Sequence, residues 1–244
     1  MKTISKKNLI LTLVLASVLV VSTSAKSMAI DGEGNAAGAC IRISTLASTN
    51  DAAVTEHMSL MKTNFANRLT EIASRQAEVD QKAATFRTNI AAKFDKKVSE
   101  LKQQSGLTTD QLTAIDTYAT NMKSAEATRE AAVDAARSTY RTALAETISA
   151  HQQSLLGAAT AFEAASTAAF ATAQADCSTA AMTTLKETIK TARETLTSVR
   201  ESSKVGQTVK QLADTRNAAI KAADEAFAKS AADYTAILKA VFIQ

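Results

Sequence analysis

The feature that most constrains the fold of this chain is the near absence of helix-breaking residues. Its 244 residues contain no proline and six glycines, three of which lie near the N-terminus. The other three are Gly106, Gly157 and Gly206, and the segments between them are rich in alanine and other good helix formers. Such a composition is typical of long helices and disfavours β-sheets. We therefore predict an all-α protein.

Apolar residues recur with helical spacing through each of these segments. They predict one amphipathic helix over 51–105 that ends at a glycine, and a second over 109–175. Thr108 and Gln111 form a capping box at the start of the second helix. Two further apolar series predict helices over 178–203 and 207–242. The first helix carries its apolar face on Val54, Met58, Met61, Phe65, Leu69, Ile72, Val79, Phe86, Ile90, Phe94, Val98 and Leu101.

The helix lengths favour an elongated antiparallel three-helix bundle over residues 48–244, built of long amphipathic, coiled-coil-like helices. The two C-terminal helices then form one third helix that is interrupted near Gly206. In this layout the apolar stripe of each helix has a partner along its length. The alternative layout has four shorter helices, with turns at both Gly157 and Gly206. We interpret Gly157 as a glycine tolerated inside a helix, because no capping or turn residues flank it.

Residues 1–25 have the pattern of a cleaved signal peptide. A lysine-rich start precedes an apolar run of about 13 residues, which is short of the roughly 20 that a membrane-spanning helix needs. Small residues then allow a cut after Ala25 or, alternatively, after Ala29. We expect an exported protein (periplasmic, surface-bound or secreted) without a transmembrane anchor once the signal is removed. Residues 26–47 are expected to form a loose tail. The alternative for residues 1–25 is a membrane anchor that is not cleaved.

Loss of the signal peptide changes the charge of the chain. The sequence has 28 Lys and Arg against 24 Asp and Glu, and removal of the three lysines of the signal leaves 25 against 24. A nearly neutral chain lacks the basic excess that attracts nucleic acid or anionic lipid. We therefore expect no nucleic-acid partner, and contact with a membrane surface is disfavoured.

The two cysteines are expected to pair. In the three-helix layout, Cys40 in the tail and Cys177 at the turn after the second helix lie at the same end of the bundle. An even number of cysteines in an exported chain predicts a disulfide between them. Unpaired or intermolecularly paired thiols are the alternative. Acylation of Cys40 fits poorly, because polar residues separate it from the apolar run.

Residues suited to catalysis or cofactor binding are scarce. His57 and His151 lie on different predicted helices, and neither has another ligand at a metal-binding spacing. Glu126 and Glu130 are four residues apart on a helix, which is common for surface charge. The sequence contains no glycine-rich phosphate loop and no nucleophile elbow. We predict no catalytic residue, no metal site, no cofactor and no enzymatic activity.

A weak internal repeat relates residues 128–136 to residues 215–223. Each copy begins with Thr-Arg and continues with paired alanines around Val133 or Ile220. Tyr140 and Phe227 then fall at the same offset. A duplicated docking surface is one interpretation, but convergence within alanine-rich helices explains the likeness equally simply and is preferred.

Three non-enzymatic functions remain. The first is a structural or protein-interaction role outside the cytoplasm, as a rod, spacer or scaffold whose partner is a protein, including a further copy of itself. The second is a holdase chaperone or adaptor that clasps exported clients through exposed apolar surface. The third is an amphipathic lipid-surface binder, which the near-neutral charge and the few aromatic residues disfavour.

Overall fold

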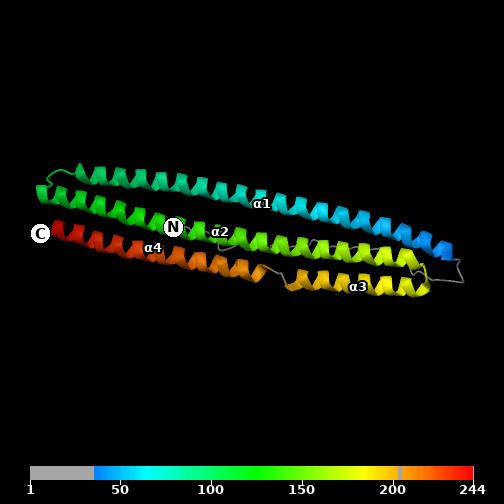
Figure 1. The fold of residues 1–244 in the computed structure, drawn as a ribbon. Coiled ribbons are helices and arrows are strands. Elements are labelled where there is room, and N and C mark those ends of the chain that lie inside the picture. The colour runs from blue at the N-terminus through cyan, green and yellow to red at the C-terminus, as the bar shows by residue number, and fades with distance from the viewer. Residues whose placement is uncertain (1–35, 203–204, 244) are drawn as a thin grey trace. The chain divides into compact units, whose positions relative to one another are not determined.

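The computed structural model describes residues 36–202 and 205–243, and every helix expected from the sequence is present in it (Figure 1). The helices are α1 (Ala36–Lys102), α2 (Thr109–Asp176), α3 (Thr179–Ser202) and α4 (Gly206–Ile243). The fold is all-α, as predicted, and forms a three-helix bundle whose third helix is interrupted between α3 and α4. The long helices α1 and α2 each contribute to two compact units, which are described separately below.

The first unit combines the start of α1 through Phe65 with Ala150–Gly206, which holds the end of α2 and all of α3. Its core is a cluster of buried apolar side chains from all three helices, with Ile43 completely buried: Ile43, Phe170, Ala173 and Leu185. Asn50 Nδ2 donates a hydrogen bond of 3.2 Å to Ser166 Oγ, and Ser166 is itself 1 % exposed. The polar atom of this buried serine is thereby satisfied.

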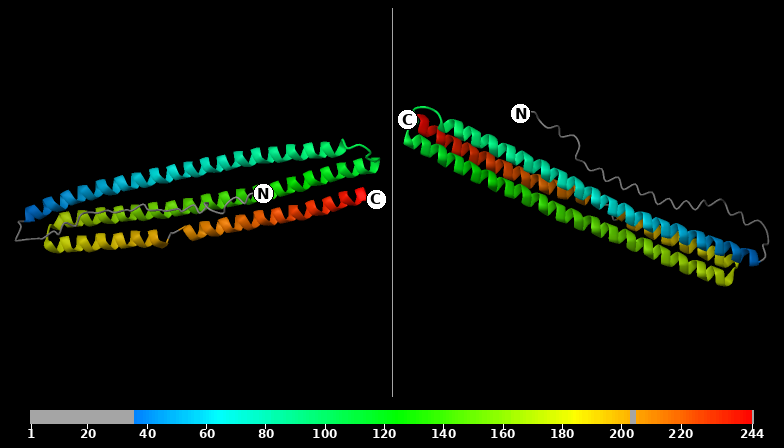
Figure 2. Two further views of the ribbon diagram at one scale, coloured as in Figure 1. Left: turned by 180° about the vertical axis from the view of Figure 1, so that it is seen from behind. Right: turned by 90° about the horizontal axis from the view of Figure 1, so that it is seen from above.

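The second unit combines Ala66–Ser149 with α4. Both views in Figure 2 show α4 beside the first half of α2, and the side-chain contacts below establish that the two run antiparallel. The buried apolar residues of this unit lie on α2 and α4: Ile115, Val133, Leu144, Ile148 and Val209. Between 66 and 102, α1 has no fully buried residue. The core of this unit therefore depends on α1 less than on α2.

Local sequence signals place the turns. Thr108 Oγ1 accepts a hydrogen bond of 3.2 Å from the backbone N–H of Gln111, and the side chain of Gln111 accepts one of 3.0 Å from the N–H of Thr108. The predicted capping box is confirmed. Gly106 has a φ of 84°, a conformation that glycine adopts without strain. The α2–α3 turn has Cys177 at a φ of 54°, and Ser178 caps α3 by accepting the N–H of Ala181 at 3.1 Å.

One expectation about helix limits was wrong, and one alternative layout is excluded. Helix α1 begins at Ala36 and not near residue 51, so the part of the predicted loose tail from 36 to 47 is helical. Its burial explains this, because Ile43 enters the core of the first unit and Leu46 and Ala47 pack against that core. The four-helix alternative fails as well, because α2 continues without interruption through Gly157.

The predicted signal peptide and residues 26–35 lie outside the described residues. Within the described parts of the chain, no helix is long and apolar enough to cross a membrane.

Candidate interaction surface

Two reciprocal arginine–aspartate pairs join α1 to α2 in the second unit, and we call them the Arg–Asp forks. Arg87 donates to both carboxylate oxygens of Asp134 at 2.8 and 2.6 Å. Arg141 binds Asp80 in the same way at 2.8 and 2.6 Å. On each helix the arginine follows the aspartate by seven residues, so the antiparallel helices present the same pattern to each other. Bidentate pairs of this kind restrict the relative orientation of the two side chains and also bring opposite charges together.

The forks change the acidity of their members. The hydrogen bond from Arg141 lowers the pKa of Asp80, and the hydrogen bond from Arg87 lowers the pKa of Asp134. The pKa values of Arg87 and Arg141 are raised by the same bonds. All four groups are therefore charged at neutral pH.

Further ion pairs continue this ladder between α1 and α2. Lys123 lies 2.7 Å from Asp95, and Lys102 is bonded to Asp116 beside the α1–α2 turn. Glu130 adds a weaker contact of 3.5 Å to Arg87. The charges on the facing sides of these helices are thus paired with each other.

The internal repeat contributes two side-chain contacts between α2 and α4. The guanidinium of Arg216 lies 4.5 Å from the ring centre of Tyr140, and that of Arg129 lies 5.7 Å from the ring centre of Phe227. The arginine of each repeat therefore meets the aromatic residue of the other. Because arginine and aromatic residue are eleven positions apart in both segments, the antiparallel helices match reciprocally. We call this arrangement the Arg–aromatic clasp; each contact is a cation–π interaction.

The clasp is not fully symmetric. Arg129 also binds Asp224 at 2.6 Å and Glu126 at 2.8 Å. Arg216 instead donates to the side-chain oxygen of its neighbour Asn217 at 2.9 Å. Position 137, which corresponds to Asp224 in the first repeat, is an arginine. The two contacts are therefore similar in geometry but differ in charge.

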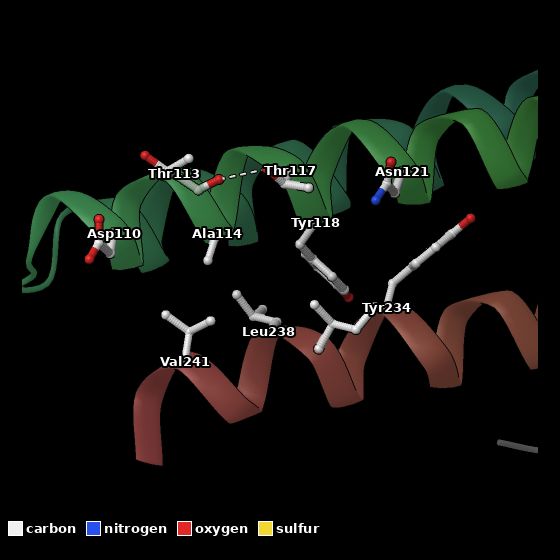
Figure 3. A pocket seen from close by; sticks show the side chains of 10 residues that line it. Asp110, Thr113, Ala114, Thr117, Tyr118, Asn121, Tyr234, Leu238 and Val241 are labelled. Atoms are coloured by element: carbon white, nitrogen blue, oxygen red, sulfur yellow. Dashed lines mark hydrogen bonds between the residues drawn. The ribbon is translucent and has the colours of Figure 1, made fainter. Parts of the chain in front are cut away.

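A groove of about 320 Å³ lies between the start of α2 and the end of α4 (Figure 3). Thr113, Thr117 and Asn121 line it from α2, while α4 contributes Leu238 and Val241. Tyr118 and Tyr234 lie where the two walls meet, and the ring of Tyr118 is also 6.1 Å from that of Phe94. The wall from α2 is mainly polar and the wall from α4 is mainly apolar.

Large apolar side chains are exposed on two helices of the second unit. Phe86 on α1 is 61 % exposed and Ile237 beside the groove is 62 % exposed. Val79 and Ile90 lie on the same side of α1 as Phe86 and are 47 % and 40 % exposed. These residues belong to the apolar face that the sequence predicts for α1, whereas Ile72, Phe94, Val98 and Leu101 of the same face are half-buried.

The histidines and acids considered for catalysis lie apart from one another. His151 is buried in the first unit, where its ring lies 6.2 Å from that of Phe65. His57 lies on α1, and Glu126 and Glu130 bind arginines as described above. Among the described residues, no group of histidine, cysteine and carboxylate side chains could hold a metal ion.

The two cysteines come together in the first unit. Cys40 on α1 and Cys177 at the α2–α3 turn form a disulfide with Cα atoms 5.1 Å apart. Cys40 was expected in a loose tail, whereas it lies in the second turn of α1. The expected disulfide is therefore present, but the tail that it was expected to join to the turn differs in one respect: Cys40 belongs to a helix.

Sequence reasoning missed the forks and the tyrosine groove. The forks had a readable signal, because an aspartate followed by an arginine seven residues later occurs on both facing helices. The groove had none, because Tyr118 and Tyr234 meet only once the register of α2 and α4 is known.

Comparison with known proteins gave no significant match to any protein-family model, curated protein or solved structure.

Proposed function

We propose that this protein is an exported, non-enzymatic helical protein that acts as a rod, spacer or scaffold in contact with other proteins. The observation that carries the proposal is the pairing of charged groups across the α1–α2 contact. Five ion pairs join the two helices, and the residue numbers of the two partners add up to 217, 218 or 221 in every pair. Such a narrow range of registers is expected when ion pairs hold two antiparallel helices together along their length.

The disulfide supports an extracytoplasmic location. Disulfides persist in oxidising compartments and are rare in the cytosol. The bond between Cys40 and Cys177, together with the signal-peptide pattern of residues 1–25, favours export.

Small-angle scattering of the purified mature chain tests the rod. At 1.5 Å per residue, helices of 67 and 68 residues would give a maximum dimension of about 100 Å. A compact particle would refute a rod or spacer. Crosslinking in the native setting then addresses partners: recovery of a small, constant set of proteins or of further copies supports a scaffold.

A holdase or adaptor is the second candidate, because Phe86 and Ile237 expose large apolar side chains. It predicts that the protein suppresses aggregation of a chemically unfolded client in a light-scattering assay. Phe86→Ser with Ile237→Ser should abolish that suppression, whereas Lys82→Ser, on an exposed lysine of α1, should not. Equal suppression by both variants would count against the holdase.

A further inference from the structure

Val79, Phe86 and Ile90 form a row of exposed apolar side chains along one flank of α1, and we call it the exposed row. Val79 and Phe86 each directly precede a residue of the forks, and one residue turns an α-helix by about 100°. Because Asp80 and Arg87 point at α2, these two apolar side chains lie on a flank that α2 does not cover. A hollow of about 480 Å³ beside Phe86 is lined by α1 residues, so the exposed row has free space next to it.

The surface around the exposed row is basic. None of the residues three, four or seven positions away from a member of the row is acidic. Four of these neighbouring residues are exposed and basic: Arg75, Lys82, Lys93 and Lys97. Arg75 and Lys82 are each bonded to a glutamate four residues earlier in α1. Among the described residues, Lys93 and Lys97 form no ion pair, so their positive charges are available to a partner.

We propose that this surface of α1 binds an acidic amphipathic helix of a partner protein. The apolar stripe of the partner helix covers the exposed row, and carboxylates beside that stripe pair with Lys93 and Lys97. Val79 and Ile90 are eleven positions apart, or about 16 Å along the helix axis, which matches about three turns of a partner helix. The inference rests on the proposed protein-interaction role and specifies the chemistry of the partner.

Two other occupants fit this surface less well. In a symmetric pair, a second copy of the chain would present the same patch, so the basic residues of the two copies would meet. The acids nearest to the row, Glu71 and Glu78, are already bonded to Arg75 and Lys82. An anionic membrane is disfavoured because the exposed row is narrow and these exposed acids would lie beside the negatively charged lipid.

Fluorescence anisotropy with two designed peptides tests the proposal on the full-length mature protein. The acidic probe is a fluorescein-labelled helical peptide of about 20 residues, with leucine at the first and fourth positions of each heptad and glutamate beside them. The basic probe has lysine in place of each glutamate. We expect saturable binding of the acidic probe that weakens as salt is added, and no binding of the basic probe.

Charge reversal of the two lysines gives the sharpest comparison. Lys93→Glu with Lys97→Glu should weaken binding of the acidic probe by about tenfold or more and create binding of the basic probe. The matched control is Lys186→Glu with Lys190→Glu, at two exposed lysines four residues apart on α3, which should leave both results unchanged. Phe86→Ser keeps every charge and should also weaken binding of the acidic probe. Circular dichroism checks that each variant is folded.

Several results would overturn the proposal. One is the absence of acidic-probe binding to the parent protein, and another is equal binding of that probe by the parent and the charge-reversed variant. A third is cosedimentation with vesicles of phosphatidylglycerol and phosphatidylcholine that the charge reversal abolishes. A fourth is a dimer in analytical ultracentrifugation that Phe86→Ser dissociates. None of these results bears on the rod or scaffold itself, which small-angle scattering and crosslinking test separately.

Discussion

Arg129 and Arg216 show how single residues can set the register between two helices. The contact between α2 and α4 otherwise consists largely of alanine. Alanine faces allow close approach but distinguish poorly between neighbouring registers, since their side chains are alike. The two arginine–aromatic contacts act at separate points along α2 and α4. Sliding α4 by one turn would break both at once.

A double-mutant cycle on Arg216 and Tyr140 measures one half of the clasp. We expect Arg216→Ala and Tyr140→Ala to be coupled by about 0.5 to 1 kcal/mol, the usual size of an exposed cation–π contact. The free energy of unfolding from urea titrations gives the coupling. Arg200 on α3 serves as the control, and its substitution by alanine should be additive with Tyr140→Ala. Additivity between Arg216 and Tyr140 would contradict the contact.

The forks predict a specific loss of stability in acid. The pKa values of Asp80 and Asp134 are lowered in the folded chain, first by hydrogen bonds from Arg141 and Arg87 respectively. An unfolded aspartate titrates near about 3.9, so the forks stabilise fully above that pH and their contribution is lost as pH falls through the folded pKa values. We expect the thermal midpoint, followed by circular dichroism, to decline below about pH 4.

The control for this decline is the pair Asp80→Asn and Asp134→Asn. This variant should start from a lower midpoint and lose less of it between about pH 5 and pH 2, since the paired carboxylates are gone. Glu187→Gln, at an exposed acid that approaches Lys190 at 3.9 Å on α3, should behave like the parent protein. A double asparagine variant with an unaltered acid decline would show that other carboxylates cause it.

At the scale of the elements, two glycines should respond in opposite ways to alanine. Gly157 lies inside α2 with open space where the methyl group of an alanine would lie, so Gly157→Ala should raise the free energy of unfolding by about 0.5 to 1 kcal/mol. Gly106 has a φ of 84°, so Gly106→Ala should destabilise the protein by about 1 kcal/mol. Urea titration of both variants gives the comparison, and equal signs would contradict the assigned conformations.

Most of the helices could be predicted from local signals. The capping box at Thr108 and Gln111 places the start of α2, and the absence of turn residues around Gly157 correctly predicts that α2 continues through it. The start of α1 could not be read in this way. Its first turns are helical because Ile43 packs against Phe170 and Leu185, and those residues lie more than a hundred positions away in sequence.

The outward turn of Phe86 has the same kind of cause. Periodicity identifies the apolar face of a helix but not which residues of that face a neighbouring helix covers. The aspartate and arginine positions of the forks were visible in the sequence, yet their importance depends on the register between α1 and α2. Local patterns therefore predicted which residues form helices better than which side of each helix faces inward.

For the whole molecule, the disulfide links two distant parts of the chain covalently. Cys40 and Cys177 are separated by 137 residues in sequence, and closing a loop of that size contributes about 5 kcal/mol in the chain-entropy model. Cys40→Ser with Cys177→Ser should lower the free energy of unfolding by up to that amount, as measured by urea titration. Reductant should destabilise the parent protein and leave the double serine variant unaffected. Free thiols in native material, detected by alkylation and peptide mapping, would contradict the bond.

The Cys40–Cys177 disulfide also determines the outcome of proteolytic cleavage at the α1–α2 turn. The α1–α2 turn around Ser105 and Gly106 is exposed, as preferred cleavage sites are. A cut there would separate the chain into two pieces, one holding Cys40 and the other Cys177. The pieces would stay covalently attached, so the nicked protein would migrate as one species until reductant is added.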